Sequence, residues 1–359
     1  MAVADDLARA RAALRMINPA PYNAEAPPEA LAGPITPTEL HYVRSNFALP
    51  DHSGTLEIGG AVRSPVTLTL DDLRAMPACE RAVTLECAGN GRLATRPLPV
   101  GEPWGDYAVS TARWTGALLQ DVLAQARPAA DGVDVRFEGA DHGAYHLQPI
   151  LAETDKDDLS FIRALPLAHA ADPAAEILIA YAMNGEPLGA DHGAPFLLIV
   201  PHWYAVASVK WLKRIDVLTE AFAGEFQTGH YMYEWPDRPH EAVRLMRVRA
   251  RITHPAHGSA ISPGTHTVRG KAWSGTGPIT RVDVSLTGEG DWYAARLEPP
   301  KGPFQWQDWA FDWGANDIGR HTLRARATDA AGNTQPEVPP WNRLGYGNNA
   351  IEVVYVDVR

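Results

Sequence analysis

The sequence predicts two domains of different class, a mixed α+β domain followed by an all-β sandwich. The chain has 359 residues, more than one typical domain holds and suited to two. Up to about residue 245, short apolar runs and helix-like stretches mix without regular alternation, which favours α+β over a doubly wound sheet. After it, short strand-like runs separated by Gly, Pro, Asn and Asp are typical of an immunoglobulin-like sandwich. We therefore divide the chain into residues 1–245 and 246–359.

The first domain opens with a predicted N-terminal helix and arm over residues 1–37. Residues 5–16 have the pattern of a short amphipathic helix, and the Pro-rich residues 18–37 read as an extended arm. A further helix is predicted over residues 115–126, where Leu118, Leu119 and Val122 share one side. Runs of buried-strand length and composition occur at residues 83–86, 177–181 and 196–200.

The second domain offers seven strand candidates. Residues 282–286 alternate apolar and polar side chains with period two, which indicates a strand with one buried face. The seven runs are residues 248–252, 266–270, 281–286, 292–297, 304–311, 321–327 and 351–358.

Charge and composition restrict the kind of partner. The net charge is −11, with 43 acidic and 32 basic residues, which argues against a general nucleic-acid binder. A small anionic substrate remains compatible, because a few local arginines can make a positive pocket in an acidic protein. No apolar run reaches the roughly 18 residues of a membrane span, and residues 1–16 lack the apolar core of a signal peptide. We expect a cytoplasmic protein, or a periplasmic or extracellular one if an export signal was removed.

One of the two cysteines lies in a segment that suits metal chemistry. Residues 84–92 read TLECAGNGR, so a strand delivers Cys87 into a loop of small residues where backbone can approach a ligand closely. Arg92 lies five positions on, and a nearby cation favours the thiolate, the form that binds metals. Taken alone, such a cysteine is more often a structural core residue.

The loop CAGNGR at residues 87–92 resembles the molybdenum-ligand loop of the sulfite oxidase family. Further segments resemble that family in the same order along residues 18–358, and their shared order makes the resemblance specific. They are HYVRSN at 41–46, RWTG at 113–116, FEGAD at 137–141, AYAMNGEPL at 180–188, DHGAP at 191–195, SVKWL at 208–212, AWSG at 272–275 and WN at 341–342. The last two resemble the family's dimerisation domain.

The resemblance implies a molybdenum-pterin cofactor with the Cys87 thiolate as the protein's ligand to the metal. It implies that the pterin is bound by Tyr42, Val43, Arg44, Asn46, Asp141, His192, Ser208 and Lys210. It implies that Arg44, Arg92 and Tyr231 serve catalysis. Guanidinium groups suit this role because they form forked, charge-assisted hydrogen bonds to oxyanions. Tyr233 competes with Tyr231 for the place of the active-site tyrosine.

The implied activity is oxidation of sulfite to sulfate by oxygen-atom transfer. No haem is expected because no Cys-x-x-Cys-His motif is present, so electrons would pass to an external acceptor, with a cytochrome c as a candidate. The resemblance also implies a homodimer. Three alternatives stay open: a reductase of the same fold acting on nitrate or a sulfoxide, a metal-free thiol enzyme using Cys87, and a non-catalytic binding module built on the sandwich.

Five positions depart from the family's pattern. One is His230, which precedes Tyr231 where the animal enzymes often have an acidic residue. Leu197 stands where an arginine is common, and His202 and Ala205 stand where glycines are common. We expect His202 to compensate by reaching the same anion. Arg343 lies one position earlier than the corresponding arginine of the animal enzymes.

Overall fold

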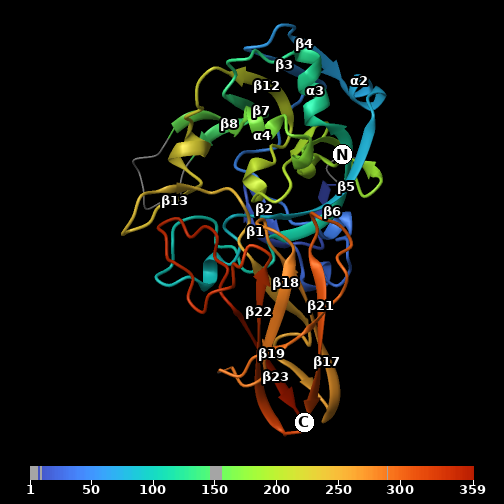
Figure 1. The fold of residues 1–359 in the computed structure, drawn as a ribbon, viewed down its shortest axis with the longest axis vertical. Coiled ribbons are helices and arrows are strands. Elements are labelled where there is room, and N and C mark those ends of the chain that lie inside the picture. Colours follow the sequence, from blue (N-terminus) through green and yellow to red (C-terminus); the bar gives the residue numbers. More distant parts are fainter. Residues whose placement is uncertain (1–6, 9, 146–155, 289) are drawn as a thin grey trace.

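The computed structural model describes residues 7–8, 10–145, 156–288 and 290–359. A broad upper part holds the first two thirds of the chain, and a narrower β sandwich extends below it, with the C-terminus near its tip (Figure 1). Strands dominate both parts, and the helices are few and short. No helix in the described ranges is long and apolar enough to cross a membrane.

Two sheets form the framework of the upper part. The first has the order β10-β9-β6-β5, with β11 paired to β9; the second has the order β4-β3-β12-β7-β8. All neighbours in these sheets are antiparallel except β3 and β12, which are parallel. The strands of the first sheet are β5 (Ala78–Glu86), β6 (Val109–Leu118), β9 (Leu178–Met183), β10 (Glu186–Pro187) and β11 (Leu197–Ile199). Those of the second are β3 (Thr55–Gly60), β4 (Val66–Thr69), β7 (Asp134–Tyr145), β8 (Lys156–Pro166) and β12 (Leu212–Leu218).

Short helices connect these strands. In α2 (Leu70–Ala75) the Thr69 hydroxyl accepts from the Asp72 amide while the Asp72 carboxylate accepts from the Thr69 amide, a reciprocal cap that fixes where the helix starts. The other α-helices are α3 (Leu119–Ala126) and α4 (Leu167–Ala170). Single turns are η1 (Pro28–Leu31), η2 (Thr38–Leu40), η3 (Arg92–Ala94), η5 (Pro173–Ala175), η6 (Ala190–His192), η7 (Ala205–Ala207) and η8 (Glu225–Gly229).

The helix predicted over residues 115–126 begins later than the sequence indicated. Residues 115–118 belong to β6, and α3 starts at Leu119. Strand pairing overrides the helical pattern because Gly116 lies directly against β9, where a Cβ would overlap the carbonyl oxygen of Ile179. The apolar stripe that suggested the helix is real from Leu119 on, where Leu119, Val122 and Leu123 are buried. The predicted strands at 83–86, 177–181 and 196–200 coincide largely with β5, β9 and β11.

The N-terminal prediction is wrong in its second half. Residues 7, 8, 10 and 11 are helical, but β1 (Arg15–Pro19) occupies the expected end of the helix and pairs with β2 (Tyr22–Glu25). The arm is therefore not merely extended: Asn23 and Glu25 are fully buried. Arg15 pairs with Glu25 both in register and through a 3.5 Å ion pair, a cross-strand contact that outweighs helix periodicity.

The C-terminal part consists of two sheets packed around a second core. One has the order β15-β17-β21-β20 and the other β16-β23-β22-β18-β19. Their strands are β15 (Arg249–His254), β16 (Ser259–Ile261), β17 (Gly264–Trp273), β18 (Ile279–Ser285), β19 (Tyr293–Ala294), β20 (Arg296–Leu297), β21 (Gln307–Ala315), β22 (Gly319–Asp329) and β23 (Glu352–Val358). Before them, β13 (Met232–Tyr233) pairs with β14 (Glu241–Ala242).

The two parts share apolar packing. The large core of the upper part also includes Trp273, Phe304, Trp306, Leu344 and Tyr346 from the C-terminal part. The predicted segment 292–297 forms only two short strands, and 304–311 enters its strand at Gln307 because Phe304 and Trp306 are buried in the other core. Side chains of the sandwich therefore reach the region where the candidate site lies.

Candidate active site

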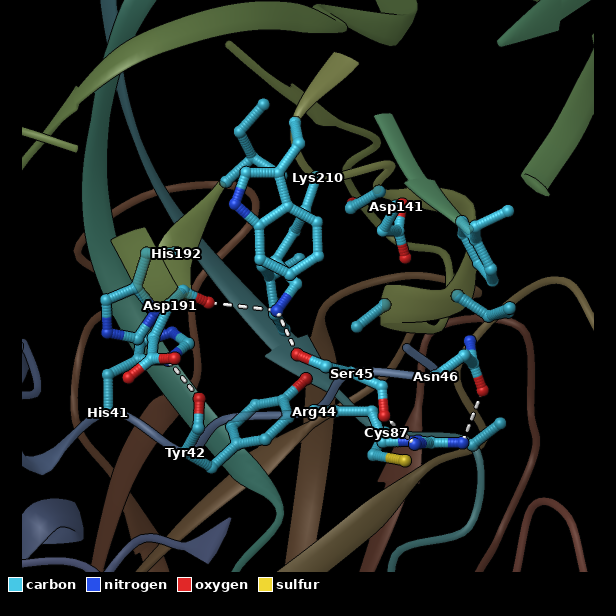
Figure 2. Close-up of a pocket in the computed structure, with 18 of the residues that line it drawn as sticks. His41, Tyr42, Arg44, Ser45, Asn46, Cys87, Asp141, Asp191, His192 and Lys210 are labelled. Atoms are coloured by element: carbon cyan, nitrogen blue, oxygen red, sulfur yellow. Dashed lines mark hydrogen bonds between the residues drawn. The ribbon is translucent and has the colours of Figure 1, made fainter. Parts of the chain in front are cut away.

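A cavity of about 760 Å³ in the upper part brings most of the predicted site residues together. The residues come from segment 41–46, the end of β5, the end of β7, the turns around η6 and η7, and the loop at 231 (Figure 2). The predicted residues that line it are Tyr42, Arg44, Asn46, Cys87, Asp141, His192, Ser208, Lys210 and Tyr231. Val43 and Arg92 do not line this cavity.

Segment 41–46 is held in place by β2. The backbone of Val43 exchanges two hydrogen bonds of 2.9 Å with Ala24, so Val43 positions its neighbours through its backbone. The Asn23 side-chain oxygen accepts from the Ser45 amide at 2.7 Å and from Arg44 Nη1 at 3.2 Å. Arg44 Nη2 in turn donates to Asn46 Oδ1 at 2.5 Å. The N-terminal arm, for which the sequence predicted no function, thus orients the Arg44 guanidinium through Asn23.

Cys87 follows directly on β5 and is 7% exposed. Its amide donates to Ala108 O, and its carbonyl accepts from the Asn90 amide, both at 2.9 Å. Figure 2 shows its sulfur beside the Arg44 guanidinium. Burial raises the pKa of the Cys87 thiol, while Arg44, the Gly89 amide and Arg92 oppose that shift. Arg92 lowers the pKa of the Cys87 thiol, as the sequence predicts, but in the cofactor-free protein burial outweighs the effect of both cations.

Lys210 and Asp141 lie in the wall of the same cavity and interact electrostatically. Lys210 Nζ donates to Ser45 Oγ at 2.8 Å and to the Asp191 carbonyl at 2.9 Å, as drawn in Figure 2. Burial lowers the pKa of Lys210 to about 8 and raises the pKa of Asp141 to about 7, each partner opposing the shift of the other. Among the described residues, no hydrogen-bond partner satisfies Asp141 Oδ1, which is buried. A buried acceptor without a partner in a cavity lined by a lysine indicates a polar ligand that donates to it.

Two neutral histidines close the same wall. His41 and His192 pack edge to face, with ring centroids 5.1 Å apart. Burial lowers the pKa of His41 to about 4 and that of His192 well below its usual value, and Lys210 lowers both further. His41 Nε2 is buried without a partner in the described part of the chain, so it is available to a ligand. His41 is a site residue that the resemblance did not indicate, although it is the first residue of the HYVRSN motif at 41–46.

Arg92 lines a second cavity that adjoins the first. The two cavities share Arg44, Asn46, Cys87 and Tyr231. Arg92 is 4% exposed; its Nε donates to Leu344 O at 3.0 Å and its Nη1 to Glu102 O at 2.7 Å. The guanidinium packs against Gly89 and Gly101, where a Cβ would lie 2.7 and 2.9 Å away, so neither position can carry a side chain without displacing it.

The structure separates the two candidate tyrosines. Tyr231 borders both cavities, stacks on Tyr346 with ring centroids 5.1 Å apart, and has a left-handed φ of 58°. Strained backbone of this kind in a non-glycine residue concentrates at functional sites. Tyr233 lines neither cavity and instead stacks on Trp235 at 5.1 Å. The placement favours Tyr231.

The departures from the family's pattern fall in different places. Leu197 and Ala205 line the first cavity, so one of its walls is apolar where an arginine is common. His202 does not: it lines a separate cavity next to the sandwich, edge-on to Phe304 at 5.0 Å between ring centroids. The expectation that His202 would reach the same anion is wrong. Arg343 is bound by the Glu234 carboxylate through its Nε and, at 2.8 Å, through its Nη2.

Arg163 is a buried cation that no motif indicated. It is 2% exposed, donates to Phe226 O, and its Cζ lies 5.9 Å from the centre of the Tyr231 ring. Burial lowers its pKa to about 10. Arg163 lies in β8, where no sequence motif marks a site residue, and the fold places it next to the Tyr231 ring.

Comparisons with known proteins agree with this geometry. A model described as the oxidoreductase molybdopterin binding domain matches residues 46–226, and the Mo-co oxidoreductase dimerisation domain matches residues 240–358. The mitochondrial sulfite oxidase of Mus musculus is 36% identical, over 99% of this chain and 67% of that protein. Nitrate reductase [NADH] 2 of Phaseolus vulgaris is 33% identical, over 96% of this chain and 42% of that protein.

A solved structure shares the architecture. The sulfane dehydrogenase SoxCD from Paracoccus pantotrophus matches with a TM-score of 0.81 and 28% identity, over 95% of this chain and 85% of that one. The matched families, the near-complete coverage and the cavity around Cys87 point to one class of enzyme. The chain belongs to the sulfite oxidase family of molybdopterin-dependent oxidoreductases, with a molybdopterin-binding domain followed by a Mo-co dimerisation domain.

Proposed function

We propose that this protein oxidises sulfite to sulfate and passes the electrons to an external acceptor, with a cytochrome c as the candidate. The observation that carries the proposal is the place of Cys87. Cys87 lines both cavities, one that also holds Lys210 and Asp141 and one that also holds Arg92. Arg44 also lines both cavities. The identity to sulfite oxidases supports the choice of substrate.

The first cavity is the proposed place of the cofactor. Lys210 supplies a buried positive charge for a phosphate, and Asp141 Oδ1 is an acceptor for a pterin N–H. Tyr42, Asn46, His192 and Ser208 would complete the polar contacts, and Val43 would act through its backbone. Cys87 would bind the metal as a thiolate. When bound, the molybdenum-pterin group supplies two-electron oxygen-atom transfer.

The second cavity is the proposed place of the substrate. Arg44 and Arg92 converge on the space next to Cys87, and both are held by hydrogen bonds to neighbouring residues. Guanidinium groups fixed in this way bind an oxyanion without having to reorganise, and they stabilise charge during transfer. The Tyr231 hydroxyl would donate to a substrate oxygen and orient it. Burial excludes bulk water from these contacts and strengthens them.

Replacing Cys87 by serine tests the proposal, with Cys79→Ser as the matched control. Cys79 lies in β5, the strand that directly precedes Cys87; it is partly buried and lines neither cavity. In a host that makes the pterin, the parent and Cys79→Ser should carry about one molybdenum per chain and oxidise sulfite. Cys87→Ser should keep its fold by circular dichroism and lose sulfite oxidation. Full activity of Cys87→Ser, or a folded parent without molybdenum, would reject the proposal and favour a metal-free thiol enzyme or a binding module.

Nitrate reduction is the second candidate, because nitrate reductases are 31–34% identical over 96% of this chain. The two candidates differ in the direction of electron flow. Assays with an oxidised dye and sulfite, and with a reduced dye and nitrate or a sulfoxide, distinguish them. A turnover with nitrate that exceeds the turnover with sulfite would replace the first proposal by the second.

The assembly belongs to the same proposal. We propose a homodimer formed through residues 246–359, with the domain division at residue 245 and an immunoglobulin-type arrangement of the sandwich. Light scattering on the full chain should give twice the 39.0 kDa of one chain. The cytoplasmic location stays a prediction.

A further inference from the structure

The carboxylate of Glu86 is buried directly beside the proposed metal ligand. Glu86 is the last residue of β5, precedes Cys87 and is 2% exposed. Its Oε1 accepts from Asn90 Nδ2 at 2.9 Å and from Arg249 Nη1 at 3.1 Å. Its Oε2 accepts from Trp273 Nε1 at 2.9 Å. Three donors therefore hold both oxygens, and only one of those donors belongs to the cysteine loop itself.

The other two donors come from the edge of the sandwich. Arg249 begins β15 and Trp273 ends β17, and the two residues are cross-strand partners in the antiparallel register. Arg249 is 4% exposed and is further fixed by Asp106, whose carboxylate it contacts at 2.7 Å. Two neighbouring strands of a rigid sheet thus present a guanidinium and an indole N–H to one carboxylate, a geometry that a loop would not hold as firmly.

The same part of the chain also binds the backbone of the cysteine loop. The Gly347 amide donates to Ala88 O at 2.7 Å, and Asn348 Nδ2 donates to Gly91 O at 2.6 Å. A Cβ at Gly91 would lie 3.2 Å from Arg249 Nη2, so the loop passes close to that guanidinium. The residues on both sides of Cys87 are therefore fixed by residues far away in the sequence.

We propose that Glu86, Arg249 and Trp273 are positioning residues that set the direction of the Cys87 thiol. Because Arg249 and Trp273 belong to the dimerisation domain, that domain helps to hold the metal ligand in place. The inference rests on the proposed role of Cys87. Successive residues at the end of a strand point to opposite sides, so anchoring Glu86 on one side fixes where Cys87 points on the other. A carboxylate bound by three donors has one orientation, and the peptide it shares with Cys87 transmits that orientation to the thiol.

The test compares Glu86→Gln and Trp273→Phe with the matched control Arg251→Lys in the full-length holoenzyme. Gln keeps the size of Glu86 but removes its charge and turns an N–H toward the Trp273 indole. Phe removes only the indole donor. Arg251 lies two residues from Arg249 in β15, is 2% exposed and pairs with Glu352 at 2.7 Å and Asp106 at 3.2 Å. Lysine keeps the charge beside Asp106, so this replacement disturbs an equally buried cation that is not one of the three donors to Glu86.

The readouts are molybdenum per chain, the EPR spectrum and midpoint potential of the metal, sulfite kinetics and the melting temperature. We expect Glu86→Gln to shift the spectrum and the potential and to lower kcat roughly 10- to 100-fold. The KM for sulfite should stay nearly constant, because the substrate contacts are intact. Trp273→Phe should shift the EPR spectrum and the midpoint potential by a smaller amount. Arg251→Lys should lower the melting temperature and leave the spectrum unchanged.

Each other outcome also decides the question. Loss of molybdenum in Glu86→Gln, with molybdenum retained in an equally destabilised Arg251→Lys, supports the inference. Equal spectra in the parent and Glu86→Gln, or equal loss of molybdenum in Glu86→Gln and Arg251→Lys, would overturn it and leave Glu86 a purely structural residue. These results are distinct from a failure of the proposed function, which would appear as a parent protein whose molybdenum does not depend on Cys87.

Discussion

Replacing Gly101 by alanine tests whether Arg92 binds the substrate anion. The Arg92 guanidinium lies against Gly101, where an added Cβ would be 2.9 Å from Cζ and 3.0 Å from Nη1. Carbon atoms in ordinary contact are about 3.5–4.0 Å apart, so the guanidinium must retreat by about 0.6–1.1 Å. Gly89 blocks part of that retreat, because the guanidinium nitrogens already lie close to its backbone. The side chain itself is not altered, so its charge is preserved.

The expected magnitude follows from the hydrogen bonds of Arg92. Its bonds to Leu344 O at 3.0 Å and Glu102 O at 2.7 Å determine where the guanidinium faces the cavity. A shift of this size removes about one charge-assisted hydrogen bond to the anion, worth about 1.5–3 kcal/mol. The kcat/KM for sulfite should therefore fall about 10- to 150-fold. Most of the loss should appear in KM, because the same contact binds substrate before and during transfer.

Gly319→Ala is the matched control. Gly101 has a φ of 118° and Gly319 a φ of 135°, but a Cβ at Gly319 would meet nothing within 4 Å. Both substitutions place alanine in backbone that favours glycine, which costs about 1–3 kcal/mol of folding free energy. Both variants should therefore lose stability in urea titrations, Gly101→Ala by the larger amount because its Cβ also displaces the buried Arg92 side chain, and only Gly101→Ala should change the sulfite kinetics.

The assay is steady-state sulfite oxidation with ferricyanide, normalised to bound molybdenum. Unchanged KM and kcat in a folded Gly101→Ala, with the kinetics of Gly319→Ala also unchanged, would show that the position of the Arg92 guanidinium does not matter for the anion. The role of Arg92 in binding substrate would then be refuted, while the family and the cofactor would be unaffected.

Three further predictions concern the cofactor cavity and the tyrosine. Lys210→Met should lower the amounts of pterin and molybdenum retained after gel filtration at least about 10-fold, since it removes a charge-assisted contact to the cofactor. The control Lys213→Met, which removes a 37% exposed side chain, should retain as much of both as the parent. Burial raises the pKa of Asp141 from 3.8 to about 7, so the folded, cofactor-free protein holds a proton that the unfolded chain releases. The stability that Asp141 contributes is therefore lost as pH rises from about 4 to 7, and the urea stability of Asp141→Asn relative to the parent should rise over that range, because all other titrating groups are common to both proteins. Tyr231→Phe should lower kcat about 10-fold by removing a hydrogen bond to substrate, and equal losses in Tyr233→Phe would contradict the assignment.

Much of the cavity could be predicted because its residues lie in short contiguous motifs. Cys87, Asp141 and Lys210 each come from a segment whose order along the chain carries the family pattern, and the fold brings the three segments to one cavity. Their environment could not be predicted in the same way. The pKa of Cys87 depends on burial, which is a property of the packed structure. Burial raises this pKa and opposes the effects of Arg44 and Arg92.

Contacts between distant residues are the part that the sequence does not reveal. Glu86 meets Arg249 and Trp273, which follow it by 163 and 187 residues, and neither is marked by a local pattern that names its partner. The helix boundary at Leu119 failed for a related reason, because the partner strand of Gly116 lies more than sixty residues on. The periodicity of apolar residues predicts which face of a helix or strand is buried, but it does not predict which strand will pair with it.

The distribution of charge explains how an acidic chain can bind an anion. The net charge is −11, yet Arg44, Arg92 and Lys210 are gathered around the thiol of Cys87. Burial keeps His41 and His192 neutral, with Lys210 acting in the same direction, so they add polar contacts without adding charge. The positive charge at the site therefore rests on two guanidinium groups and one ammonium group, each held by hydrogen bonds. Their fixed positions, rather than the net charge of the protein, determine where an anion can bind.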